Sequence, residues 1–333
     1  MTSVSYGDLA HSFLLRRQSV ASKTEMQFLQ AEVVTGISRD ITAKVRGDVV
    51  PLTGLDSTVQ RLAGYETLAR EQLLVTGAMQ SALNTVHDLS SNLAEFLVGI
   101  SLGVSETRVA AAAATARSNL ETVVSALNTR FGDRSIFSGM ATSAPAMTDA
   151  NTLLNAAQTV VAGLTSAQDI ETALATWFNS PTGFEATIYQ GGPPLAPFIV
   201  SAGEEANMNI TALDPGIKIT LQGLTMAALL DRGLLAGQTE ERQRVSNRAG
   251  ASLLQSNTDR AYLTGRLGAI EAQIEDAAAR NSAEATSLRI VRNDITNVDP
   301  YEVAARLQDN QAQLEKIYTL TARMTRLSLM DYL

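Results

Sequence analysis

Few residues in this sequence have the types and spacing that chemistry requires. The 333-residue chain has no cysteine and two histidines, His11 and His87. Disulfides, thiolate nucleophiles and cysteine-based zinc sites are therefore excluded. The two histidines fall on separate predicted helices, and neither has a nucleophile or carboxylate at catalytic spacing. We interpret both as surface or helix-packing residues, and we predict no enzyme activity, no cofactor and no metal site.

The remaining polar motifs are also better explained by structure than by catalysis. Glu204 and Glu205 are adjacent, so their side chains point apart, and we expect them in a solvated turn. Gly191-Gly192 lacks the strand–glycine–helix context of a phosphate loop. Asp169 lies three residues after Ser166, which predicts a helix cap. Asn209-Ile210-Thr211 matches a glycosylation sequon, a triplet that is common by chance.

The amino-acid composition limits the kinds of partner that this protein can bind. The 26 basic and 34 acidic residues give a net charge of −8, which argues against nucleic acid because phosphate binding needs a basic surface. The sequence contains no run of 18 apolar residues, so we predict no membrane span. Its N-terminus does not show the arrangement of charged and apolar residues that is typical of a cleaved secretory signal. Aromatic residues make up 5% of the chain, which favours thin helical seams over a thick core.

The eight prolines divide the chain into three parts. None occurs between 52 and 144 or between 216 and 299. Because proline disrupts helix interiors, both gaps have room for long helices. The region from 145 to 215 holds six of the prolines. The pattern predicts helices at both ends and an irregular middle.

Heptad spacing supports the first long helix. Leu68, Val75, Ala82, Leu89 and Phe96 are seven residues apart, and Met79, Val86, Leu93 and Ile100 form a second row. Two such rows are typical of a coiled-coil seam. Ser105 is placed to cap a following helix, which we expect to run to Phe131 and stop at Gly132.

A second long helix is predicted from about 245 to 297. One heptad row contains Leu253, Leu267, Ile274, Leu288 and Ile295, and a second contains Leu263, Ile270, Ala277, Val291 and Val298. Polar residues interrupt both rows, and Arg260 is the one between Leu253 and Leu267. Asp299-Pro300-Tyr301-Glu302 then carries an N-cap, a proline at N1 and a glutamate at N3. We therefore expect a last helix over 300–331.

The middle of the chain has mixed signals. IETALATWF and GLTMAALLDR predict short helices. FEATIYQGG, APFIVSA, NMNITAL and IKITLQ read as strands separated by Gly, Pro and Asp turns. The fold class is thus mainly α, a long antiparallel helical coiled coil or bundle from both chain ends with a small inserted α+β domain.

Three domains follow from this layout. Residues 1–45 with 299–333 would form terminal helices, 46–135 with 240–298 a helical rod, and 136–239 the inserted domain. The N-terminal helix, about 5–38, carries Phe13, Val20, Gln27 and Val34 seven apart. A two-helix stem cannot bury two apolar faces, so we expect the remaining face to contact other chains.

Several segments resemble the flagellin-like family, particularly its hook-filament junction members. GDRSIFSG, at 132–139, resembles the stretch that ends the family's N-terminal helical region. TGFEATIYQGG and LQGLTMAALL are similar to the outer domain, and the ending DPYEVAARLQDNQAQLEKIYTLTARMTRLSLMDYL is the most similar part. The segment 35–57 departs from the pattern, because it lacks the family's paired aspartates.

The resemblance implies a structural protein of the bacterial flagellum. Such a protein is exported through the type III apparatus without a cleaved signal and forms an extracellular ring of copies between hook and filament. Its neighbours would be another hook-associated protein and flagellin, and a cytoplasmic export chaperone would shield the C-terminal helix. Both chain ends would be disordered in the monomer and fold on assembly.

The expected contact residues for subunits or chaperone are Phe13, Val20, Leu314, Ile317, Met324 and Leu327. Three alternatives stay open: flagellin itself, a type III-secreted coiled-coil effector or tip protein, and a helical cytoplasmic scaffold. The LSLMDYL ending and an insertion of roughly 100 residues favour the junction role.

Overall fold

The computed structural model describes residues 6–100 and 105–330. Side chains are described from Ala10 to Met324, apart from that of His11, so the His11 and Leu327 side chains lie outside the described residues. The fold is mainly helical, as predicted, with small inserted strands. It divides into two compact units: residues 1–62 with 283–333, and residues 63–282.

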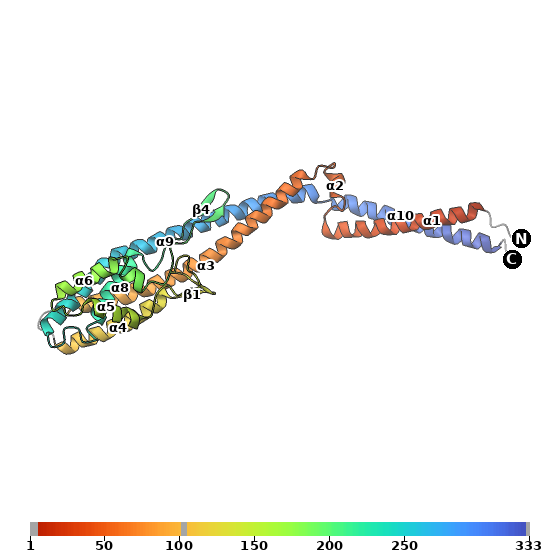
Figure 1. The fold of residues 1–333 in the computed structure, drawn as a ribbon. Coiled ribbons are helices and arrows are strands. Elements are labelled where there is room, and N and C mark those ends of the chain that lie inside the picture. Colours follow the sequence, from red (N-terminus) through yellow and green to blue (C-terminus); the bar gives the residue numbers. More distant parts are fainter. Residues whose placement is uncertain (1–5, 101–104, 331–333) are drawn as a thin grey trace. The chain divides into compact units, whose positions relative to one another are not determined.

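The first unit is built around two paired terminal helices, α1 (Tyr6–Thr35) and α10 (Pro300–Met330), which lie antiparallel and side by side (Figure 1). Gly36, with a φ of 70°, ends α1 by donating its N–H to Glu32 O at 2.8 Å. Asp299 starts α10 by accepting the N–H of Tyr301 at 2.8 Å, which confirms the predicted start. A short helix, α2 (Ile41–Lys44), follows α1.

Two long helices contribute to both units, α3 (Val50–Val98) and α9 (Thr239–Thr296). Within the second unit they pack together as the heptads predict: the row of Met79, Val86, Leu93 and Ile100 is fully buried. The other row is buried less, and Phe96 is exposed. Gln80 of α3 donates to Thr264 O of α9 at 3.4 Å. Val291, in the first unit, is exposed, so the α9 rows are buried mainly before residue 283.

The second unit also contains the inserted region and the main hydrophobic core, which extends from Ala69 to Ala277. Residues of the inserted region share this core with residues of α3 and α9, and the helices at 106–127 and 215–228 contact each other. The described residues of this unit form two antiparallel hairpins, β1 with β2 within 130–135 and β3 with β4 within 198–206. Its further elements are α4 (Glu106–Leu127), β1 (Arg130–Phe131), β2 (Arg134–Ser135), α5 (Ala150–Val160), α6 (Ala167–Asn179), α7 (Phe184–Thr187), β3 (Phe198–Ser201), β4 (Glu204–Ala206) and α8 (Pro215–Ala228).

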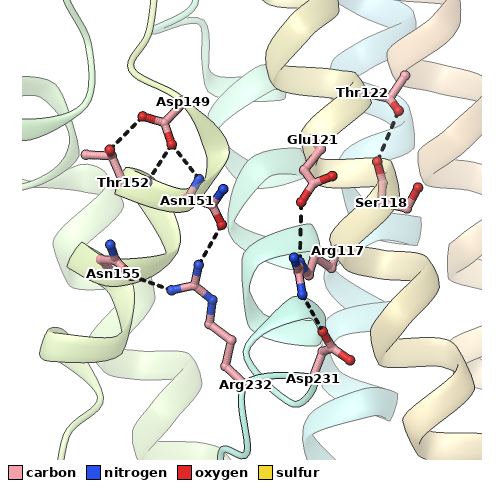
Figure 2. A network of polar contacts seen from close by, with 10 residues as sticks. All are labelled: Arg117, Ser118, Glu121, Thr122, Asp149, Asn151, Thr152, Asn155, Asp231 and Arg232. Atoms are coloured by element: carbon pink, nitrogen blue, oxygen red, sulfur yellow. Dashed lines mark hydrogen bonds and ion pairs between the residues drawn. The ribbon is translucent and has the colours of Figure 1, made fainter.

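Hydrogen bonds tie the turn after α8 to two neighbouring helices (Figure 2). Arg232 donates to Asn151 Oδ1 of α5 at 2.8 Å and also to Asn155 Oδ1. Arg117 of α4 pairs with Asp231 at 3.2 Å. Asp149 caps α5 by accepting two backbone N–H groups and the Thr152 hydroxyl, and these bonds from Thr152 lower the pKa of its carboxyl.

Several local predictions for the inserted region are wrong. IKITLQ is part of helix α8, not a strand, since Pro215 occupies the first helical position after Asp214. FEATIYQGG contains the short helix α7, and NMNITAL contains no strand. Helix α4 ends at Leu127, and Phe131-Gly132 lies in the β1–β2 hairpin, where Gly132 has a φ of 58°. The predicted N-cap of α6, Ser166, is confirmed.

Candidate assembly surface

The face of α1 that meets α10 follows a four-three spacing. Leu29 and Ser22 are buried there, and three further side chains are half-buried, Leu15, Ser19 and Met26. Sequence reasoning missed this face because two of its five positions are serines, which weaken the apolar pattern. The positions themselves, spaced 4, 3, 4 and 3 residues apart, are the signal that could have found it.

The predicted row on α1 lies on the exposed part of the helix. Phe13 is 67% exposed, Val20 60% and Val34 84%. An amphipathic helix packed on one partner normally turns such side chains inward. Here α1 has a second apolar row that α10 does not cover, and it is available for contact with another chain.

On α10, the predicted contact residues fall into the pairing with α1. Leu314 and Ile317 are buried together with Val303, and Met324 is half-buried. Leu320 and Tyr318 remain about half exposed. The structure thus separates the six predicted residues into an exposed pair, Phe13 and Val20, and an intramolecular set on α10; Leu327 lies outside the described side chains.

Polar contacts add to this helix pair. Arg306 pairs with Glu25 at 3.3 Å. The Lys23 ammonium lies 5.5 Å from the centre of the Tyr318 ring, and its hydrogen bond to the Tyr318 hydroxyl lowers the pKa of that phenol. Both contacts are solvent-exposed, so their contribution to stability is small. Apolar burial is the main force that holds the pair together.

A backbone clamp joins the two linkers that lead to the pair. Ile37 and Asn297 form an antiparallel bridge. Ser38 donates its N–H to Thr296 O and Val298 donates to Gly36 O, each at 2.9 Å. Lys44 Nζ also donates to Asn297 O. Exposed apolar side chains gather in the segments on either side of this clamp: Val33, Val34, Ile37, Val49, Val50, Ile290, Val291 and Tyr301.

The polar residues considered above as candidates for chemistry have surroundings that are explained by their role in the fold. His87 is half-buried in α3, and Glu204 of β4 pairs with Arg280 of α9. Asn209 is exposed while Thr211 is buried. In the described part of the chain no three His, Asp or Glu side chains cluster as metal ligands. Likewise, none of the helices described is long and apolar enough to cross a membrane.

Gly191 and Gly192 have a packing role. The N–H of Gly192 is donated to Ser138 O at 2.8 Å, and Tyr189 donates its hydroxyl proton to Gly192 O at 2.8 Å. A Cβ on Gly191 would lie 2.5 Å from Ser138 O. The glycines therefore allow two backbone segments to approach, and no phosphate loop is needed to explain them.

This chain is similar to known proteins, in part of its sequence and in its fold. Residues 254–333 match the family model of the bacterial flagellin C-terminal helical region, which covers much of α9 and all of α10. A solved structure from Vibrio parahaemolyticus, described as a candidate flagellar hook-associated protein, is similar in fold. It is 12% identical, with a TM-score of 0.54, and the match covers 74% of this chain and 96% of that one.

No curated protein matches the chain. The family match includes the C-terminal segment, whose resemblance to the family was strongest. Residues 254–333 are thus similar to the bacterial flagellin C-terminal helical region, and the chain is similar in fold to a solved structure described as a candidate flagellar hook-associated protein.

Proposed function

We propose that the protein forms the junction between the flagellar hook and filament, as a hook-associated protein 3. One observation carries this: α1 has an exposed apolar row, Phe13, Val20 and Val34, on a helix whose other apolar row is already occupied by α10. Exposed rows of this kind are characteristic of protein interaction sites. In a flagellin-like protein, the partners that fit are copies of the same chain and its neighbours in the flagellum.

In this proposal, residues 1–45 with 299–333 build the inner tube, 46–135 with 240–298 form the rod, and 136–239 form an outer domain. Another hook-associated protein and flagellin bind on either side of the ring. The chain is exported without a cleaved signal and works outside the cell. Before export, a chaperone binds the α10 residues Leu314, Ile317, Met324 and Leu327 in place of α1.

The alternatives are a flagellin filament subunit and a type III-secreted coiled-coil effector or tip protein. The similarity to a hook-associated fold and the LSLMDYL ending support the junction role over the filament role. The flagellin C-terminal region at 254–333 supports a building role over an effector role.

Charging the exposed row tests the assembly role. We expect Phe13→Asp with Val20→Asp to abolish filament growth while leaving the fold intact, because both side chains are exposed in the single chain. The matched control is Gln18→Asp with Gln30→Asp, which adds the same charge at exposed polar positions of α1. Motility and electron microscopy of complemented cells are the measurements; normal filaments in the first variant would contradict the proposal.

Removing the protein distinguishes the three functions. Cells without it should secrete flagellin into the medium and carry bare hooks, because filament would have no base on which to grow. Loss of the flagellin itself would instead follow if this chain were the filament subunit. Fluorescent labelling of the complemented strain should give one band at the distal end of each hook, and normal filaments in the deletion strain would favour the effector.

A further inference from the structure

Arg260 is a buried cation in an apolar row. It takes the position between Leu253 and Leu267 on α9, and both leucines are fully buried. Arg260 itself is 4% exposed. Burying a charge is costly unless it is paired, so an arginine at this position calls for an explanation.

Its partners are neutral groups from three helices. Nη1 donates to Thr220 Oγ1 of α8 at 3.0 Å, and Nη2 donates to Ser91 Oγ of α3 at 3.3 Å. On α9 itself the guanidinium contacts Ser256 and the carbonyl oxygen of Leu253. No carboxylate in the described chain lies within the 4.0 Å of an ion pair, and Nε has no partner.

This environment does not stabilise the charge strongly. Burial lowers the pKa of Arg260 to about 10. Even well-paired buried ions often add little stability compared with apolar side chains of similar size. A role in specifying one packing arrangement is the better-supported use of such a residue, as with polar residues at core positions of coiled coils.

A second feature marks the same place. Gly216 of α8 lies so close to α9 that a Cβ there would be 3.0 Å from the carbonyl carbon of Asp259 and 3.2 Å from the nitrogen of Arg260. Seven residues later, a Cβ on Gly223 would be 2.8 Å from the Leu253 side chain. The close approach of α8 therefore spans the same two turns of α9 as the Arg260 contacts.

We propose that Arg260, with its acceptors Ser91 and Thr220, fixes the axial register of α3 and α8 on α9. Heptad rows alone allow a slip of one heptad, about 10 Å along the axis, that again packs apolar rows together. Such a slip takes the guanidinium away from both hydroxyls and leaves it buried without them. The slipped packing is therefore excluded. In this role Arg260 selects one helix register over the others and does not make the fold more stable.

Spin-label distances test the register directly. The chain has no cysteine, so Glu71→Cys and Gln255→Cys give two labels, on exposed positions of α3 and α9. In the full chain we expect one narrow distance distribution. Adding Arg260→Leu should broaden it or add a population displaced by about 10 Å, while the urea midpoint reported by Trp177 fluorescence stays equal or rises.

Two further variants keep the test decisive. Arg248→Leu removes a half-exposed arginine that pairs with Glu171, and it should leave the distance distribution unchanged. Thr220→Val with Ser91→Ala removes the acceptors on the neighbouring helices and should broaden the distribution as Arg260→Leu does. A narrow, unshifted distribution in both core variants would overturn the proposal, and so would loss of folding in both, because Arg260 would then be required for stability.

Discussion

Gly139 shows how a single residue allows two distant segments to meet. It has a φ of 59°, and a Cβ there would lie 2.3 Å from Pro193 O and 2.7 Å from Gly192 O. The N–H of Met140 is donated to Pro193 O at 2.9 Å. This glycine ends GDRSIFSG, a segment that resembles the flagellin-like family, but nothing in the local sequence predicts that it contacts Gly192 and Pro193, 53 and 54 residues further along the chain.

Alanine at this position should therefore carry two penalties. We expect Gly139→Ala to lower the free energy of unfolding of the second unit by about 3 kcal/mol, from backbone strain and backbone overlap together. Gly163→Ala is the matched control: its φ is 80° but no atom lies within 4 Å of the added Cβ, so about 1 kcal/mol is expected. Urea unfolding followed by the single tryptophan, Trp177, measures both, and equal losses would exclude the overlap.

Among the helices, the pairing of α1 with α10 contains an imperfect position. Asn310 Oδ1 is buried without a hydrogen-bond partner, while Leu314 and Ile317 further along α10 are buried apolar residues. An unsatisfied buried polar atom costs about 1–3 kcal/mol. The α1–α10 pair is therefore less stable than it would be with an apolar side chain at this position.

Replacing this residue should strengthen the pair. We expect Asn310→Leu to slow amide hydrogen exchange throughout α10, by about tenfold if the gain is about 1.4 kcal/mol. Gln311→Leu, at an exposed position next to it, should leave exchange unchanged. Hydrogen exchange followed by mass spectrometry gives the rates, and equal rates in the wild type and Asn310→Leu would show that the amide is satisfied in solution.

The elements differ in how well the sequence predicts them. The long helices α3, α9 and α10 were predicted because their heptads and the Asp299-Pro300 start are local signals. Only the second half of α8 was predicted as a helix, from GLTMAALLDR; its first half, IKITLQ, was wrongly predicted as a strand, and the chain is buried without interruption from Thr220 to Leu230. A helix buried on all sides has no amphipathic period, and its β-branched residues resemble a strand. For the assembly surface, the sequence predicted apolar rows, but it could not tell which row faces the paired helix.

At the scale of the whole molecule, burial is distributed unevenly. The main core lies entirely within residues 63–282. The first unit has a narrow seam and most of the exposed large apolar side chains of the described residues. Segments with few buried contacts open most readily. The two ends should therefore be the first parts of the free chain to lose structure.

Light proteolysis checks this expectation. Cleavage of the purified monomer should remove the ends and leave a fragment close to 50–298, identified by mass spectrometry. In assembled flagella the same ends should resist cleavage, because neighbouring copies would cover them. Ends that survive as long as the 50–298 fragment in dilute monomer would contradict the prediction that they fold on assembly.

The clamp between Ile37 and Asn297 also has a mechanical consequence. Its two backbone hydrogen bonds join the incoming and outgoing passages of the chain. A pull applied to α1 alone is therefore shared with the segment before α10, and both bonds must break before the passages part. If the chain assembles as proposed, a load on either terminus would be shared between the two passages of the chain instead of being carried by one.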